Sequence, residues 1–262
     1  MLGRLLPESV YQRLLAASVI RDLRAGTLTE PELALVPTLL RNGETAIDVG
    51  ANHGMWTLPM SRAVGEEGVV VAFEPVPFTA GTLRRVLERL GCRNVRLQQC
   101  ALGEERGSAE IAVPIQSSGV TDAGRAHLAS RHAGDLDAAP FRRVAVAVER
   151  LDDHLAELGE VALLKADVEG AELFALRGAT ALIARDSPVV VCEVDPDFLE
   201  GFGLDVSDLT GFFEDRGYRT FVLRGQREGR LEALAPSGIS EAGNYVFVPE
   251  LRLSRLAAHL RR

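Results

Sequence analysis

The stretch that decides the fold reads Ala46-Ile47-Asp48-Val49-Gly50-Ala51-Asn52-His53-Gly54. A β-rich run from Thr45 to Val49 leads into a glycine-rich turn, and a helix-like segment begins near Trp56. Glycines let a backbone approach a ligand closely, and the first turn of a helix offers free N–H groups. A strand, a glycine turn and a helix in this order therefore predict a βα unit that binds a nucleotide or nucleoside.

The spacing of the glycines in the turn narrows the choice of ligand. The dinucleotide fingerprint is G-x-G-x-x-G, whereas this turn is G-x-N-x-G, with Asn52 at the middle position. That pattern fits a pyrophosphate clamp poorly. It fits a loop around the methionine end of S-adenosylmethionine, with Asp48 near the ammonium group. An NAD-dependent oxidoreductase and a non-catalytic nucleoside-binding protein remain as alternatives.

A second signal lies one βαβ step later, in Val71-Ala72-Phe73-Glu74-Pro75. An acidic residue at the end of this strand can accept hydrogen bonds from both hydroxyls of a ribose. Pro75 fixes the direction in which the chain leaves the strand. Together with the glycine turn, Glu74 indicates a cofactor that contains adenosine.

The third signal is a cluster of charged residues in Leu164-Lys165-Ala166-Asp167-Val168-Glu169-Gly170-Ala171-Glu172. Ligands of open α/β sheets bind beyond the carboxyl ends of the strands, so Asp167 and Glu169 are candidates for the active site. Lys165 is the single lysine of a chain that otherwise uses arginine. It either serves the chemistry or pairs with a neighbouring carboxylate, and Glu172 is expected to favour the start of a helix.

Strand-like and helix-like segments alternate around these motifs. This alternation predicts a doubly wound α/β fold with a mostly parallel sheet. The chain divides into a helical segment (1–42), the main domain (43–250) and a helical tail (251–262). Strands are predicted at Thr45–Val49, Val69–Phe73, Val95–Gln99, Val161–Ala166, Val189–Val194, Tyr218–Leu223 and Tyr245–Val248, and helices at Trp56–Val64, Thr79–Leu90, Ala171–Ala184 and Ser207–Arg216.

One segment, about 108–149, breaks the alternation. Ser108–Val113 and Arg143–Glu149 look like the strands of a hairpin, and their long polar connection contains His127 and His132. A connection of this length is usually functional, and we interpret it as a cover over the active site. A solvated surface insertion, with ordinary loop histidines, is the alternative.

Composition limits the partners. The 262 residues carry a formal net charge of −8, which argues against nucleic acid as a partner. No apolar run is long enough for a membrane span, and no signal-peptide core is present, so a cytoplasmic protein is expected. Three cysteines at wide spacing predict neither a disulfide framework nor a zinc site.

Six stretches of this sequence together resemble the FkbM family of methyltransferases. They are IDVGANHG (47–54), AFEP (72–75), ALGEERG (101–107), ERLDDHL (149–155), LLKADVEGAELFALRGA (163–179) and VVVCEVDP (189–196). The resemblance implies a class I methyltransferase fold of seven strands, with the last one antiparallel. It also implies S-adenosyl-L-methionine as cofactor and a hydroxyl on a sugar, a natural product or another small molecule as acceptor.

The resemblance also assigns residues to the cofactor. It implies that Asp48, Gly50, Asn52 and Gly54 lie at the methionine end and that Glu74 holds the ribose. The segment from Gln99 to Leu102 would lie beside the adenine. Many class I enzymes carry an aspartate there, whereas this chain has Cys100-Ala101-Leu102. Backbone groups and apolar contacts from Ala101 and Leu102 are therefore expected to hold the base.

Methyl transfer to a hydroxyl needs a group that removes the acceptor proton. We hypothesise that Asp167 or Glu169 orients and deprotonates the acceptor, and His53 is a further candidate. His53 follows the glycine turn, so it could equally contact the cofactor or serve packing. Asp167, Glu169 and Glu193 could converge as oxygen ligands, but no spacing demands a metal, and none is predicted.

Overall fold

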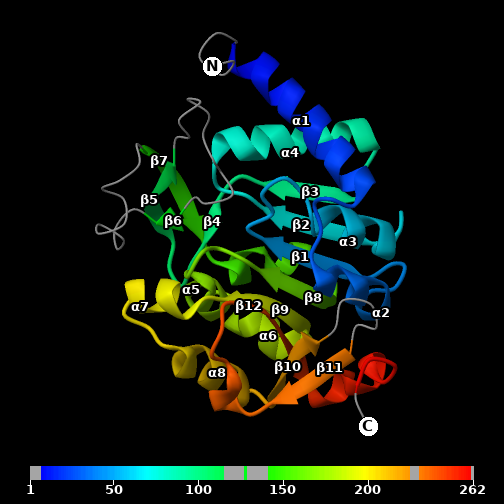
Figure 1. Cartoon of the computed structure of the whole chain (residues 1–262), viewed down its shortest axis with the longest axis vertical. Helices are drawn as coiled ribbons and strands as arrows, with labels where there is room; N and C mark the ends of the chain where they lie inside the picture. The colour runs from blue at the N-terminus through cyan, green and yellow to red at the C-terminus, as the bar shows by residue number, and fades with distance from the viewer. Residues whose placement is uncertain (1–6, 115–126, 129–140, 225–229, 261–262) are drawn as a thin grey trace.

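The structure is a computed structural model that describes residues 7–114, 127–128, 141–224 and 230–260. Its main sheet contains β1 (Thr45–Val49), β2 (Val69–Phe73), β3 (Val95–Gln98), β8 (Val161–Ala166), β9 (Val189–Val194), β10 (Tyr218–Arg224), β11 (Arg230–Leu234) and β12 (Gly243–Pro249). The strand order is β11-β10-β12-β9-β8-β1-β2-β3 (Figure 1). Strands β3, β2, β1, β8 and β9 pair in parallel, and β12 runs antiparallel between β9 and β10.

Helices cover both faces of this sheet. The α-helices are α1 (Glu8–Ala25), α2 (Val36–Leu39), α3 (Thr57–Val64), α4 (Pro77–Leu90), α5 (Glu172–Arg177), α6 (Thr180–Asp186), α7 (Pro196–Gly201) and α8 (Val206–Glu214). Short 3-10 helices are η2 (Pro31–Leu35), η5 (Leu151–Glu157), η6 (Pro236–Gly238) and η7 (Glu250–Leu256). Helix α1 lies across α4, at one end of the molecule (Figure 1).

The central strands are buried on both faces, which explains their continuous apolar sequences. Ile47 and Leu164 pack into one core, together with residues of α5, α6 and α8. Their neighbours Ala46 and Leu163 point the other way, into a core that includes residues of α2, α3 and η7. The predicted doubly wound α/β fold is therefore confirmed, and strands β1, β2, β8 and β9 have the predicted bounds.

The sheet has one strand more than the seven that the resemblance implied. Strand β11 pairs antiparallel with β10 at the sheet edge. Its sequence, Arg-Leu-Glu-Ala-Leu, buries Leu231 and leaves Arg230 and Ala233 exposed. A short strand of this kind gives only a weak alternation in the sequence, because an edge strand needs few buried side chains.

The single helix predicted over Ala171–Ala184 is wrong, since the structure has two short helices there. The break lies at Gly178, where a Cβ atom would come within 2.0 Å of the Gly103 carbonyl oxygen. Helix α6 then starts anew, and the Asp152 carboxylate accepts hydrogen bonds from the N–H groups of Ala181 and Leu182. A close approach of two backbones and a distant cap therefore set this break.

A smaller sheet stands beside the main one. It contains β4 (Ala101–Leu102), β5 (Gly107–Pro114), β6 (His127–Leu128) and β7 (Phe141–Glu149), in the order β4-β7-β5-β6. Strands β5 and β7 form the predicted antiparallel hairpin. Most of the connection between them, including His132, lies outside the described residues, so its role as a cover over the active site stays a prediction.

The division of the chain at residues 42 and 250 likewise stays a prediction. In the described part of the chain, no helix is both long and apolar enough to cross a bilayer.

Candidate functional site

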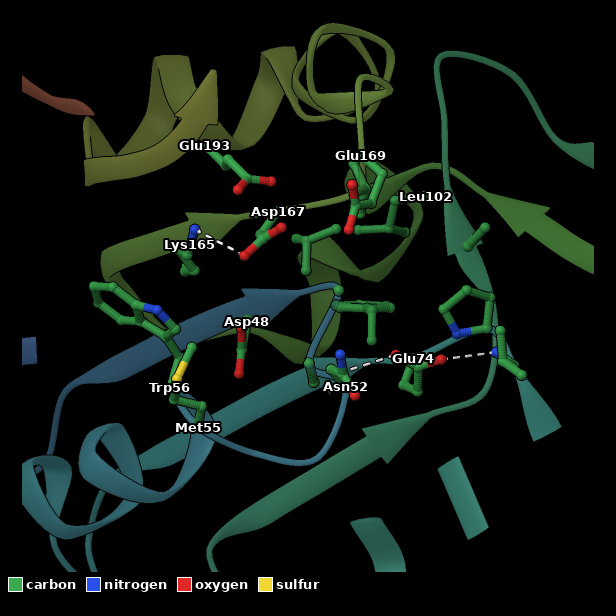
Figure 2. A pocket seen from close by; sticks show the side chains of 18 of the residues that line it. Asp48, Asn52, Met55, Trp56, Glu74, Leu102, Lys165, Asp167, Glu169 and Glu193 are labelled. Carbon is green, nitrogen blue, oxygen red and sulfur yellow. Dashed lines mark hydrogen bonds and ion pairs between the residues drawn. The ribbon is translucent and has the colours of Figure 1, made fainter. Parts of the chain in front are cut away.

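A cavity of about 330 Å³ opens where the carboxyl ends of β1, β2 and β8 meet (Figure 2). Its size suits a small-molecule ligand. The structure brings all but one of the predicted site residues into its wall. They are Asp48, Gly50, Asn52, His53, Glu74, Pro75, Ala101, Leu102, Lys165, Asp167 and Glu169.

The turn after β1 depends on glycine. Gly50 has a φ of +82°, and a Cβ atom there would lie 1.8 Å from the carbonyl oxygen of Asp167. Asn52 follows in the left-handed region with a φ of +46°. Gly54, the exception to the pocket lining, faces Leu83, which its Cβ would approach to 2.8 Å. Gly54 thus lets α4 pack on the turn, whereas Gly50 lets the turn pass over β8.

Glu74 stands at the end of β2 and is buried. Its carboxylate accepts hydrogen bonds from the N–H of Asn52 at 3.0 Å and from the N–H of Val76 at 2.9 Å. Burial nevertheless outweighs these bonds and raises the pKa of Glu74 to about 7. The two N–H groups fix the carboxylate and leave it lone pairs for further donors.

The neighbouring acceptors lie on the glycine turn and on β1. The buried Asp48 accepts a hydrogen bond from the Thr57 hydroxyl at 2.5 Å, and burial raises its pKa to about 6. Among the described residues, no hydrogen-bond partner reaches the buried Oδ1 atom of Asn52. A buried acceptor without a hydrogen-bond partner is costly in free energy, so this atom indicates a ligand that carries hydrogen-bond donors.

Charged groups gather at the other end of the cavity (Figure 2). The ammonium of Lys165 lies 3.3 Å from Asp167 Oδ2 and is fully buried. Glu193, at the end of β9, hydrogen-bonds Asp167, and burial together with that carboxylate raises the pKa of Glu193 to about 9. The protonated form of Glu193 is therefore favoured, and it faces the Asp167 carboxylate, which lies beside the ammonium.

The loop after β8 holds its two glutamates, Glu169 and Glu172, in different surroundings. Glu169 lines the cavity and has a left-handed φ of +55°. Glu172 turns back into its own loop, where its carboxylate accepts hydrogen bonds from the N–H groups of Val168 and Gly170. Its burial raises the pKa of Glu172 to about 7. The geometry thus gives Glu172 the expected role at the helix start and leaves Glu169 in the pocket.

Within the described ranges, no three His, Cys, Asp or Glu side chains form a group that could hold a metal ion. Asp167, Glu169 and Glu193 therefore do not make up such a group, although all three line the cavity. His53 lines it as well, and its role stays a prediction.

Sequence reasoning missed three residues that surround Lys165. Asn244 accepts a hydrogen bond from the ammonium at 2.7 Å, the Trp56 ring centre lies 5.4 Å from it, and Glu30 bonds both Asn244 and Trp56. The one signal in the sequence is the lone lysine, which requires partners once it is buried. Nothing in the spacing could identify these partners, because Asn244 stands 79 positions after Lys165.

Comparison with known proteins identifies the family. The model of the methyltransferase FkbM domain matches residues 48–220, which is more than half of the chain. The chain belongs to the FkbM methyltransferase family. The match includes the glycine turn, Glu74 and the charged loop after β8, whereas Glu30 and Asn244 lie outside it.

Two curated relatives are fungal methyltransferases. "Methyltransferase 1" of Beauveria bassiana is 35% identical over 50% of this chain and 57% of its own length. "Methyltransferase sdnD" of Sordaria araneosa is 30% identical over 50% of this chain and 59% of its own length. The chain thus spans less than two thirds of the relatives that it matches. A solved FkbM methyltransferase from Methylobacillus flagellatus is 19% identical, with a TM-score of 0.49, over 80% of this chain and 44% of that one.

Membership of this family makes S-adenosyl-L-methionine the cofactor, and the cavity fits it. The ligand carries an ammonium group and two ribose hydroxyls, all of them donors. The wall near the glycine turn offers acceptors, namely Asp48, the Oδ1 atom of Asn52 and the fixed carboxylate of Glu74. The donor-rich ligand and the acceptor-rich wall complement each other.

Proposed function

We propose that this protein transfers a methyl group from S-adenosyl-L-methionine to a hydroxyl oxygen of a small molecule, such as a sugar or a natural product. The observation that carries the proposal is the Asp167 carboxylate. It is held against a buried ammonium in the same cavity as the glycine turn and Glu74. A carboxylate fixed beside a methyl donor can both orient an acceptor and take its proton.

The cofactor side of the cavity follows from the acceptors on its wall. Asp48 and Asn52 are suited to the ammonium end, and Glu74 is suited to the ribose. Ala101 and Leu102 supply the apolar edge at which an adenine ring would pack. Gly50 allows the chain to pass close to all of them, because no side chain fits at that position.

When bound, the cofactor supplies an activated methyl group on a sulfonium, whose C–S electron pair stays on the sulfur. The protein has to place the acceptor oxygen and receive its proton. Asp167 is partly exposed, lines the cavity and lies against the buried ammonium, so it is the proposed base. Glu169 is the second candidate for the same role, since it lines the same wall.

Two alternatives remain as outcomes of the test. Family membership and the G-x-N-x-G turn both argue against an NAD-dependent oxidoreductase. A non-catalytic nucleoside-binding protein would keep the acceptor-rich wall but have no need for the charged end of the cavity. The buried Lys165 and the raised pKa of Glu193 beside Asp167 favour a catalyst, because perturbed groups of this kind gather where chemistry is done.

The proposal is tested by incubating the protein with methyl-labelled cofactor and a panel of hydroxylated, aminated and carboxylated acceptors. Mass spectrometry of the products shows which atom carries the label. Transfer to hydroxyl oxygens is expected. Transfer confined to amines or carboxylates would overturn the acceptor class, and cofactor binding without any transfer would favour the binding protein.

A further inference from the structure

The ammonium of Lys165 lies in a cage formed by the side chains of its near neighbour Asp167, of Trp56 (Figure 2) and of Asn244, which stands 79 positions further along the chain. It donates to Asn244 Oδ1 at 2.7 Å, lies 3.3 Å from Asp167 Oδ2, and stands over the Trp56 ring at 5.4 Å. The side chain is 1% exposed, so solvent cannot replace any of these contacts. The orientation of the ammonium is therefore determined by the protein alone.

Glu30 connects the other two members of this cage. One of its oxygens, Oε2, accepts a hydrogen bond from the Nδ2 of Asn244 at 2.8 Å and another from the Nε1 of Trp56, also at 2.8 Å. Because the Asn244 amide donates to Glu30 through nitrogen, its oxygen faces Lys165. Glu30 thus fixes which atom of the amide the ammonium meets.

A purely structural role explains this cage poorly. Burying an ammonium costs free energy that an apolar side chain of similar size would not cost. The chain uses arginine at every other basic position, yet it has lysine at this one. A compact ammonium on a flexible stem reaches a single carboxylate oxygen in a way that the planar guanidinium does not. The position therefore requires the charge and the shape of the ammonium, and Asp167 is its anionic contact.

We propose that Glu30 and Asn244 are positioning residues for methyl transfer, which hold the Lys165 ammonium against Asp167 and so fix the carboxylate that takes the acceptor proton. This inference rests on the proposed function. Both residues lie outside the segment that matches the family, 48–220. The N-terminal stretch before η2 and the first residues of β12 therefore complete a site whose other parts come from the family domain.

Kinetics test the proposal with substitutions of graded severity. Asn244→Leu and Glu30→Leu remove the hydrogen bonds at nearly constant volume, and kcat is expected to fall at least tenfold, with the KM for the cofactor within twofold. Glu30→Gln keeps one oxygen that can accept hydrogen bonds from both Trp56 and Asn244, so its kcat should stay within about threefold of the wild-type value. The control is Glu67→Gln, since Glu67 accepts from the Asn42 amide at 2.8 Å outside the cavity.

The single lysine gives a readout that needs no turnover. Protein labelled with ¹³C-lysine shows one lysine in its spectrum, because Lys165 is the only one in the chain. A locked side chain should give two separate Hε signals. These should merge in Asn244→Leu and Glu30→Leu, and stay separate in Glu30→Gln and Glu67→Gln.

The outcomes separate the two proposals. If the wild type transfers no methyl group to any acceptor, the proposed function fails, and this positioning role fails with it. If transfer occurs but both Leu variants keep the wild-type kcat, or lower kcat without changing the lysine signals, the positioning role is overturned alone. The Glu30 variants keep the test decisive if Asn244→Leu does not fold, because Glu30 lies in a half-exposed stretch before η2.

Discussion

Asp167 is 28% exposed on its side chain, whereas the ammonium that it contacts is buried. The carboxylate can therefore reach a ligand in the cavity while its other contacts stay fixed. Glu193 shares its surroundings, but burial and the neighbouring carboxylate raise the pKa of Glu193 and so favour its protonated form. Pairs of acids whose environments separate their protonation states are common in active sites, since one of them can then act as the base.

Replacing the carboxylate of Asp167 should stop proton removal while leaving the cofactor bound. For Asp167→Asn we expect kcat to fall by about 10²–10⁴-fold, the usual contribution of general base catalysis. Glu169→Gln is the companion variant and should cost less, because the carboxylate that lies 3.3 Å from the buried ammonium is that of Asp167. Steady-state kinetics on the best acceptor measure both. A larger loss in Glu169→Gln would transfer the role of base to Glu169.

The pH dependence of cofactor binding follows from Glu74. The pKa of Glu74 is raised to about 7 in the free protein, and hydrogen bonds donated by the ribose hydroxyls would favour its ionised form. The free protein therefore holds a proton that the complex releases, so affinity for S-adenosylhomocysteine should be constant above pH 7 and weaken as pH falls below it. Because one proton is involved, this affinity can fall by at most about tenfold per pH unit.

Calorimetry between pH 5.5 and 8.5 measures this dependence. Glu74→Gln should remove most of it, and Asp48, whose pKa is about 6, should account for what remains at the acid end. An affinity that does not change with pH in the wild type would show that Glu74 does not receive the ribose.

Among the elements, the turn from β1 into α3 carries the most stringent backbone requirement. Gly50 and Gly43 have nearly the same φ, +82° and +84°, but only Gly50 has a neighbour where a side chain would go. Alanine at either position meets a similar strain of roughly 1–2 kcal/mol. Gly50→Ala should in addition displace the turn from β8 and abolish cofactor binding, whereas Gly43→Ala should keep it. Retained binding in folded Gly50→Ala would contradict the role of the turn.

The degree of burial explains which elements could be predicted from the sequence. Strands β1, β2, β8 and β9 are buried on both faces, so their continuous apolar runs fixed their bounds to the residue. The edge strand β11 buries little and gave no clear pattern. The break between α5 and α6 depends on the Gly103 carbonyl and on Asp152, which are remote in sequence, so no local pattern could reveal it.

On the scale of the whole molecule, residues near the chain ends tie the layers together. Arg252 of η7 is 5% exposed, and its guanidinium donates to the carbonyl oxygens of Asp186 and Ser187 and to the Glu160 carboxylate. Arg252 thus anchors the C-terminal segment to the connection between α6 and β9. A buried carbonyl that loses its donor costs free energy in the folded state.

Arg252→Met should lower the free energy of unfolding by about 2–4 kcal/mol, because two carbonyl groups lose their partners. Urea denaturation followed by circular dichroism measures the change. Arg106→Met is the control, since the Arg106 side chain is 73% exposed in its ion pair with Asp153 and should contribute little. An equal effect of the two substitutions would rule out the anchoring role.

The residues of the site also divide into those that a local motif predicts and those that only the complete fold brings together. Most of the predicted residues that line the cavity come from short motifs and could be found by their positions after strands, whereas Ala101 and Leu102 were predicted only from the resemblance. Glu30 and Asn244 come close to Lys165 only because the whole fold brings an N-terminal stretch and strand β12, which pairs with β9, near the end of β8. Such residues carry no local signal, and only the arrangement of the complete sheet brings them to Lys165.

We propose that the glycine turn and Glu74 hold the two ends of one S-adenosyl nucleoside. Isothermal titration of the wild-type protein with S-adenosylhomocysteine, and in parallel with NAD, tests it most directly. One bound S-adenosylhomocysteine per chain, weakened at least tenfold by Glu74→Ala, and no heat from NAD are predicted. Absence of S-adenosylhomocysteine binding, or binding of NAD in its place, would contradict the account.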